Sequence, residues 1–269
     1  MARDQARTTT LLQPAFGWLR LPLFYLLDLA VVLVFLFFYY LGRGFPSDRP
    51  DLATSNALDI IRLQQALGIF HEGAWQRAAL NHPDLIEFAN FVYTAMHMPL
   101  IVVLGLLFFL VNSRKHRVLR NAILLSAFVA VPIYYFYPLT PPRLLAEHGH
   151  AGFGFVDTLP TTDRIKPGAL ANWYAAMPSY HYGWNFLATI GVFWSWKNWA
   201  PRAAAVAFSG VMWWAIVVTG NHYFLDMVAG AAIMVPCLWL ALQFERWADR
   251  NPERVARFTV RAGPVRLPF

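Results

Sequence analysis

Residues 220–244 read GNHYFLDMVAGAAIMVPCLWLALQF, a polar cluster followed at once by an apolar run. A helix that crosses the hydrocarbon core of a bilayer needs about 20 predominantly apolar residues. The run at 225–244 meets this requirement, and Asn221, His222 and Asp226 stand at its beginning. The stretch therefore predicts a membrane-spanning helix that holds ionisable side chains at one end.

The composition of the whole chain also favours a membrane location. Of the 269 residues, 58% are hydrophobic and only 14% are charged, whereas about a quarter of the residues in a soluble domain are charged. The net charge of +7 comes from residues between and after the apolar runs. This distribution indicates membrane topology and no nucleic-acid partner. The single cysteine, Cys237, excludes a disulfide within the chain.

Five further apolar runs bring the expected number of spans to six. They cover about residues 21–41, 86–111, 121–137, 182–197 and 203–220. The first run is too long for the core of a signal peptide, so we expect it to be retained. The predicted fold is all-α, a polytopic membrane helical bundle at 21–245 with about six transmembrane helices.

The basic residues predict the orientation of these spans. The segments 1–20, 112–120 and 198–202, the adjoining Lys197 and the tail 246–269 together hold 15 of the 22 basic residues. Basic residues concentrate in cytoplasmic loops, so both termini are expected in the cytoplasm. The tail is either a basic helical face on the inner leaflet or a solvated extension. The bias of 19 Arg against 3 Lys suggests a bacterial plasma membrane.

Two long segments are then expected on the outer side. Within 42–85, residues 56–80 have apolar side chains at helical spacing but are too polar to span. They predict an amphipathic helix on the outer leaflet or over the bundle. The segment 138–181 is rich in Pro and Gly. Its part 148–155 has no helical or strand pattern, which fits a mobile lid as well as a passive connector.

Three polar stretches fall on this outer side. They are Tyr-Pro-Leu-Thr-Pro-Pro-Arg-Leu at 137–144, Met-Pro-Ser-Tyr-His at 177–181, and Gly-Asn-His-Tyr-Phe-Leu-Asp at 220–226. Ionisable groups near lipid are costly and usually mark functional sites. We therefore expect the three stretches to form one site.

The residue types suggest phosphate chemistry. His222 and Asp226 are four residues apart, so a helix would let the carboxylate orient the imidazole, although such pairs are also purely structural. Ser179 is a favoured N-cap residue, and a helix that begins there could bind an anion beside His181, a candidate general acid. Arg143 could grip phosphate oxygens in a bidentate way, or snorkel to the interface.

Pro-Pro-Arg-Leu, Met-Pro-Ser-Tyr-His and Asn-His-Tyr-Phe-Leu-Asp, in this order, resemble the signature motifs of the type 2 phosphatidic acid phosphatase superfamily. The resemblance is strongest to its inositolphosphotransferase branch, which includes inositol phosphorylceramide synthase. Residues 65–72, Gln-Ala-Leu-Gly-Ile-Phe-His-Glu, also resemble that branch. The resemblance covers roughly residues 20–245.

The resemblance implies a role for each motif residue. His222 is the nucleophile that becomes phosphohistidine, Asp226 orients it, and His181 acts as general acid and then as base. The implied phosphate-binding residues are Arg143, Ser179, Tyr180 and Asn221. The family requires no metal and no cofactor.

The chain departs from the phosphatase form of these motifs. That form has lysine, proline, glycine and arginine where this chain has Phe136, Leu144, Tyr180 and Ile216. Two expected cations are thus missing. Either the substrate is a less charged phosphodiester, or Arg164 or Lys166 of the outer loop replaces them.

The predicted function is an outward-facing lipid phosphotransferase or phosphatase that moves a phosphoryl or phospho-headgroup from a lipid to water or an inositol-type alcohol. One alternative is a lipid phosphate or polyprenyl (pyro)phosphate phosphatase. A zinc site at His181, His222 and Asp226 is another, which Arg143 disfavours by repulsion. A non-enzymatic lipid transporter is the third, without an inverted repeat to support it.

Other polar or aromatic residues near lipid receive structural interpretations. Asp28 and His97 are expected to bond neighbouring helices. Trp173, Trp184 and Tyr223 are expected in the interfacial aromatic belt.

Overall fold

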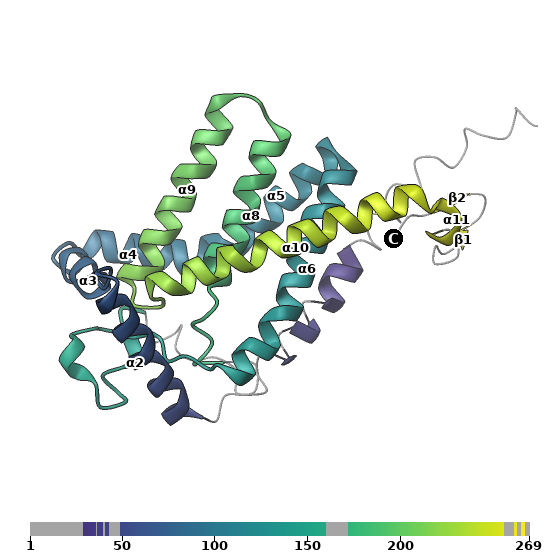
Figure 1. The fold of residues 1–269 in the computed structure, drawn as a ribbon. Helices are drawn as coiled ribbons and strands as arrows, with labels where there is room; N and C mark the ends of the chain where they lie inside the picture. Colours follow the sequence, from purple (N-terminus) through teal and green to yellow (C-terminus); the bar gives the residue numbers. More distant parts are fainter. Residues whose placement is uncertain are drawn as a thin grey trace, which may run out of the picture. The chain divides into compact units, whose positions relative to one another are not determined.

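The computed structural model describes residues 29–35, 37–39, 41–42, 49–159, 172–255, 261–262 and 265–266 (Figure 1). The chain forms two compact units. The larger unit is Tyr39–Glu245, and the smaller one combines Met1–Phe38 with Arg246–Phe269. In the smaller unit the structure describes an apolar helical stretch from Leu29, the short helix α11 (Pro252–Val255), and an antiparallel pairing of β1 (Arg261–Ala262) with β2 (Val265–Arg266).

The apolar helices of the chain make it a membrane protein. Four described helices are long and apolar enough to span: Pro83–Val111, α6 (Ser113–Phe136), α9 (Trp199–Val218) and α10 (Phe224–Arg250). The helix α8 (Tyr180–Ser195) and the apolar stretch Leu29–Tyr39 are shorter. The fold is therefore helical and membrane-bound, and six spans stay a prediction.

The first of these spans is built from three pieces. It joins α4 (Pro83–Phe91), the π-helical turn η1 (Val92–Met96) and α5 (His97–Val111). A π-turn is rare and usually occurs where one residue has been inserted into an α-helix, often at a functional site. The turn changes the direction of the side chains that follow it.

The outer segment contains two helices where the sequence predicted one amphipathic helix. They are α2 (Pro50–Ala66) and α3 (Glu72–Leu80). The break is at Gly68, whose φ of 70° is a left-handed conformation that favours glycine and ends a helix. The backbone N–H groups of Gly68 and Ile69 return to the carbonyls of Gln65 and Gln64. The prediction missed this break because the apolar spacing continues across it.

Two apolar clusters hold the larger unit together. One joins α3, α4 and η1 to the end of α9 and includes the buried residues Val92, Met212 and Ile216. The other packs α2 against parts of the segment 138–181, including Leu145 and Phe155. Burying such a side chain contributes about 1.5–3 kcal/mol. The outer loop is thus anchored to α2 on both sides of the short turn η3 (Ala151–Phe153).

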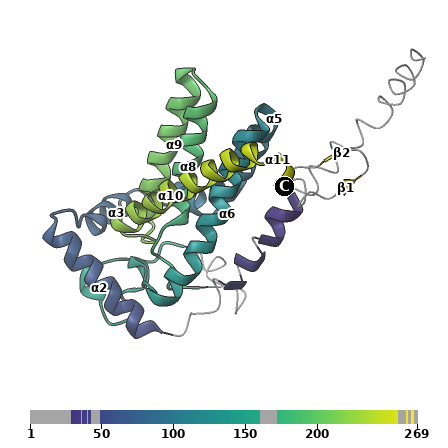
Figure 2. The same ribbon diagram turned by 45° about the vertical axis from the view of Figure 1, so that its right-hand side comes forward.

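The helices α8 and α9 form an antiparallel hairpin, and they lie side by side in both ribbon views (Figures 1 and 2). The connection between them is only Trp196–Asn198. Lys115 of α6 donates a hydrogen bond to the carbonyl of Trp194 in the last turn of α8, and Arg202 of α9 donates to those of Phe193 and the C-cap Trp196. Cations at a helix C-terminus oppose the negative end of its dipole. This end of the hairpin is therefore capped by basic side chains.

Candidate active site

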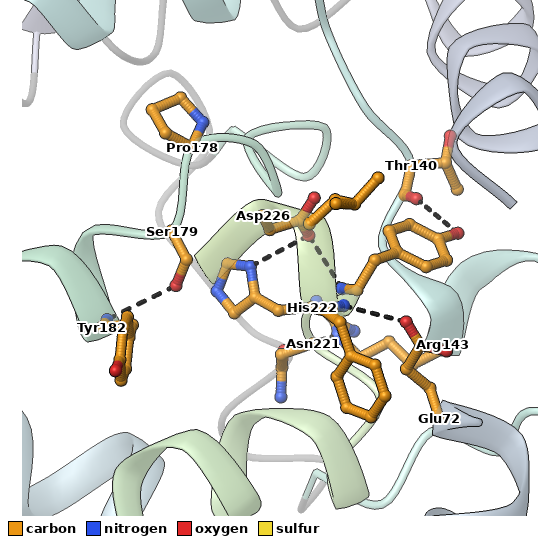
Figure 3. Close-up of polar contacts among 12 residues, drawn as sticks. Glu72, Thr140, Arg143, Pro178, Ser179, Tyr182, Asn221, His222 and Asp226 are labelled. Carbon is orange, nitrogen blue, oxygen red and sulfur yellow. Dashed lines mark hydrogen bonds and ion pairs between the residues drawn. The ribbon is translucent and has the colours of Figure 1, made fainter. Parts of the chain in front are cut away.

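His222 and Asp226 lie in contact, as their spacing predicted, but not on one helical face. His222 is two residues before α10, and the Asp226 carboxylate reaches back across the first turn, with 3.3 Å between His222 Nδ1 and Asp226 Oδ2 (Figure 3). The same Oδ2 accepts a hydrogen bond of 2.9 Å from the backbone N–H of Tyr223. Both side chains are buried. The carboxylate thus orients the imidazole and leaves its Nε2 for another partner.

The turn before α10 gives His222 its position. The backbone N–H groups of Asn221 and His222 both donate to the carbonyl of Ile216. Gly220 has a φ of 69°, and a Cβ there would lie 3.1 Å from the Cβ of Arg143. A glycine is required because it allows both the left-handed backbone and the close approach. The turn thus holds His222 and the arginine segment together.

Ser179 brings the second polar stretch to the same place. It is the N-cap of α8, and its Oγ accepts a long hydrogen bond of 3.5 Å from the N–H of Tyr182. Its own N–H donates to the carbonyl of Asp226 at 2.9 Å. The approach is possible because Gly230 has no side chain, since a Cβ there would lie 2.2 Å from the Ser179 carbonyl oxygen. The N-terminus of α8 is therefore fixed beside the His222–Asp226 pair.

His181 and Tyr180 follow the cap and point to different surroundings. The rings of His181 and His222 have centroids 5.9 Å apart, and His181 is only partly buried. The hydroxyl of Tyr180 instead donates to the carbonyl of Ser126 on α6 at 2.6 Å. Its side chain therefore belongs to the packing of two helices. Only the backbone of Tyr180 is placed at the helix N-terminus.

Arg143 reaches the site from the first polar stretch. Its Nε donates to Oδ1 of Asn221 at 2.9 Å, and its backbone N–H donates to the carbonyl of Gly220. A terminal nitrogen forms a salt bridge of 3.0 Å with the partly buried Asp157, and Arg143 itself is buried. The guanidinium also lies over the ring of Trp173, which places that residue at the site and not in an aromatic belt alone.

We did not expect Asp157 from the sequence. It lies in the outer loop, outside the three polar stretches, and no spacing rule connects it to Arg143. The only signal is its acidic character in a loop that follows a motif arginine. Its contact matters because it neutralises the arginine that was expected to grip phosphate.

A second unexpected group comes from α2 and α3. Glu72 Oε1 accepts a hydrogen bond of 2.8 Å from the N–H of Phe224 (Figure 3). It also accepts one of 2.6 Å from the side-chain amide of Gln64. Gln64 also accepts from the N–H of Leu225 at 3.0 Å. Burial raises the pKa of the Glu72 carboxyl above its ordinary value of 4.5. The two side chains cap the N-terminus of α10, immediately after His222.

Gln76 completes this support. Its amide nitrogen donates to the carbonyls of Val156 and Val218, and its oxygen accepts from the N–H of Val156. It therefore links α3 to the outer loop and to the end of α9. Gln64, Glu72 and Gln76 are fully buried, so the polar stripe of this segment faces the protein. The stretch at 65–72, singled out by resemblance, contained one of the three residues.

Phe136 and Ile216, which stand where the phosphatase motifs have cations, differ in their exposure. Phe136 is 74% exposed near the end of α6, whereas Ile216 is fully buried in the apolar cluster of α9. Neither position offers a cation to the site. Arg164 and Lys166, the proposed replacements, lie outside the described residues.

His97 is also close to the site, although we expected it to bond neighbouring helices. Its ring lies 4.5 Å from that of His181 and 6.0 Å from that of Trp184, measured between centroids. Trp184 is buried and donates to Ser126, so it is a packing residue and not an interfacial one. Tyr223 is fully buried as well. Within the described ranges, no group of three or more His, Cys, Asp or Glu side chains is arranged to hold a metal ion.

The chain matches the sequence model of the PAP2 superfamily over residues 58–240. No curated protein and no solved structure matches it. The matched region contains all three polar stretches, together with Glu72, Asp157 and His97. The chain therefore belongs to the PAP2 superfamily, whose members are in general phosphatases or phosphotransferases.

Proposed function

We propose that the protein is a lipid phosphotransferase or phosphatase that works through a phosphohistidine on His222. The observation that carries this proposal is the contact of His222 Nδ1 with the buried Asp226 carboxylate, beside the N-terminus of α8. The contact directs Nε2 away from the carboxylate. A free imidazole nitrogen beside a helix N-terminus suits attack on a bound phosphoryl group.

The first half of the reaction forms the phosphoenzyme. Nε2 of His222 attacks phosphorus, and the bond from phosphorus to the leaving oxygen breaks. His181 donates its proton to that oxygen, so the product leaves as a neutral alcohol. The Asp226 carboxylate stabilises the positive charge that develops on the His222 ring.

The second half returns the enzyme to its starting state. His181, now neutral, takes the proton of water or of an acceptor alcohol. The acceptor oxygen attacks phosphorus, the bond from phosphorus to nitrogen breaks, and His222 is released. Ser179, Asn221, the N–H groups around Tyr180 and Arg143 are the groups proposed to hold the phosphate oxygens throughout.

The charge of the site favours a phosphodiester over a phosphomonoester. The guanidinium of Arg143 is paired with Asp157, and Phe136 and Ile216 supply no further cation. A diester carries one negative charge, whereas a monoester near neutral pH carries close to two. We therefore propose transfer of a phospho-headgroup to an inositol-type alcohol as the main reaction, as in the inositolphosphotransferase branch. Monoester hydrolysis becomes the main reaction if Arg164 or Lys166 enters the site.

The proposed site lies on the outer face of a bacterial plasma membrane, in a six-span topology. The basic residues expected in a loop at 112–120 form the N-cap and first turns of α6, and Arg143 follows the end of this helix. A helix of 24 residues is about 36 Å long, close to the thickness of a bilayer core. The length of α6 thus supports a placement of the basic residues and the site at opposite membrane faces. Glu147→Cys should react with an impermeant thiol reagent in intact cells, and Asn112→Cys should not.

Trapping of the intermediate tests the mechanism. The purified protein is mixed with phosphatidate, phosphatidylinositol or a polyprenyl pyrophosphate, each carrying a radioactive phosphate, and quenched in alkali. We expect alkali-stable, acid-labile label with at least one donor, and none in His222→Ala. His148→Ala is the matched control, because this outer-loop histidine contacts Tyr174 and not the site. Turnover without label, or turnover in His222→Ala, would refute the proposal.

The same preparation separates the alternatives. A zinc enzyme loses activity with chelators and regains it with zinc. A transporter moves labelled lipid between leaflets while the phosphoester bond stays intact. A (pyro)phosphate phosphatase releases inorganic phosphate whether or not an alcohol acceptor is present.

A further inference from the structure

Four rings from two helices alternate beside the candidate active site. In order they are Tyr93, His181, His97 and Trp184, and we refer to them as the ring stack. The centroid distances between successive rings are 4.4, 4.5 and 6.0 Å. Tyr93 and His97 come from the span Pro83–Val111, and His181 and Trp184 come from α8. The imidazole of His181 is thus in contact with two rings of another helix.

The two rings that contact His181 come from the π-turn η1 and its end. Tyr93 lies within η1, and His97 is the first residue after it. Residues four apart on a helix lie on one face of it, so both side chains leave the span on the side of α8. The ring of His181 contacts both of them.

The far end of the ring stack is anchored. Trp184 is buried, and its indole N–H donates to the hydroxyl of Ser126 at 3.1 Å. The His97 ring is nearly parallel to that indole, with an interplanar angle of 18°, and is itself buried. His97 therefore contacts both the anchored indole of Trp184 and the imidazole of His181. Stacked aromatic pairs contribute about 0.5–1.5 kcal/mol beyond the area that they bury, enough to favour one side-chain rotamer.

We propose that Tyr93 and His97 are positioning residues for His181. They hold its imidazole at the site, 5.9 Å from the His222 ring, where it can deliver a proton to the leaving oxygen. The proposal rests on the function proposed above, because it gives His181 the role of general acid.

The need for such positioning follows from the place of His181 in α8. It is two residues after the N-cap Ser179, in the first turn of the helix, and only partly buried. A side chain at a helix end has few neighbours of its own helix to restrict its rotamer. Proton transfer requires heavy atoms within about 2.6–3.2 Å, and a displacement of about 1 Å can reduce the rate about 100-fold.

Leaving-group dependence distinguishes positioning of an acid from general damage. A nitrophenol leaves without help, whereas an alkyl alcohol needs a proton. Each variant is therefore assayed on a nitrophenyl and an alkyl ester of the same phosphoryl headgroup. The ratio of kcat/KM for the two substrates, measured on one preparation, does not depend on the fraction of folded protein.

We expect Tyr93→Ala and His97→Ala to raise the nitrophenyl-to-alkyl ratio about 10- to 100-fold, in the same direction as His181→Ala. Tyr93→Phe keeps the ring and should leave the ratio within about twofold of wild type. Phe88→Ala is the matched control, because it removes a ring pair of the same span that involves Trp214 and not His181.

Three results would overturn the inference in different ways. If His181→Ala raises the ratio and both ring variants leave it unchanged, Tyr93 and His97 do not position the acid, and the proposed mechanism survives. If His181→Ala lowers both rates equally, His181 is not the general acid, and this part of the proposed function fails together with the inference. An increase in Phe88→Ala equal to that in His97→Ala would show that any loss of packing in this span has the same effect.

Discussion

Replacing Asp157 by asparagine is the sharpest test of why this site should accept phosphodiesters. The carboxylate forms a partly buried salt bridge of 3.0 Å with Arg143, and Asn221 accepts a hydrogen bond from Nε of the same guanidinium. Asp157→Asn removes one negative charge and keeps a side chain of the same size. Because Asn221 still orients the arginine, we expect the guanidinium to stay in place and gain an unopposed positive charge.

The size of the effect follows from the distances. A carboxylate about 6 Å from a bound phosphoryl group, at an effective dielectric constant of about 20, repels each unit of negative charge by roughly 3 kcal/mol. A dianionic monoester carries about one more unit of negative charge than a monoanionic diester, so the carboxylate repels it by roughly 3 kcal/mol more. About 1.4 kcal/mol corresponds to a tenfold change in a rate or equilibrium constant. The upper limit is therefore roughly a 100-fold change in the ratio of monoester to diester kcat/KM. Solvent at the mouth of the site reduces it, so we expect about 10- to 100-fold.

The assay compares nitrophenyl phosphate with a nitrophenyl phosphodiester on wild type and Asp157→Asn. We expect the ratio of monoester to diester kcat/KM to rise in the variant and the rise to shrink with added salt. Glu147→Gln is the matched control, because it removes an exposed carboxylate of the same loop. An unchanged ratio, or an equal rise in Glu147→Gln, would refute the charge argument. A fall in both rates would mean that Asp157 instead holds Arg143 in position.

Three further predictions concern the supports of the site. Asp226→Asn keeps the size of the side chain but removes the charge that orients His222, so we expect kcat to fall about 100-fold or more, measured with saturating nitrophenyl ester. Gly230→Ala places a methyl group against the Ser179 carbonyl and should lower the free energy of unfolding by about 1–3 kcal/mol. Gly210→Ala is the control and should leave this free energy unchanged, because Gly210 has open space around it. Glu72 has a raised pKa, so the folded state binds its proton more tightly, and its contribution to stability falls as pH rises above 4.5. Glu72→Gln should therefore flatten the decrease of melting temperature with pH in that range, and an identical pH profile would contradict the buried, raised carboxyl.

The contacts between motifs were largely predictable from the sequence. Arg143, Ser179 and Asp226 are far apart in the chain, yet each belongs to a polar stretch that loop charges assign to one membrane face. Such groups are costly near lipid, so convergence is the expected arrangement. The contacts of Arg143 with Asn221 and of Ser179 with Asp226 follow this expectation.

The supports of the site were not predictable in the same way. Gln64, Glu72 and Gln76 form a polar stripe, and a polar stripe on an amphipathic helix normally faces water. Here Gln64 and Glu72 accept from the first N–H groups of α10, and Gln76 bonds to Val156 and Val218. These partners become visible only once the tertiary arrangement is known. The π-turn is hidden for a similar reason, because the hydrophobic run at 86–111 is continuous with or without one extra residue in a turn.

The bonds of α2 and α3 to the ends of α9 and α10 have a consequence for biogenesis. Gln64 and Glu72 bind the N–H groups of Leu225 and Phe224, which leave the ribosome about 150 residues later. The carbonyl of Val218, which accepts a hydrogen bond from Gln76, is likewise synthesised long after its partner. The supports are thus made first, and the site becomes complete only after α10 has been synthesised and has packed against them. A partly inserted chain would carry an incomplete site, so bilayer lipids would not meet a reactive histidine before assembly is finished.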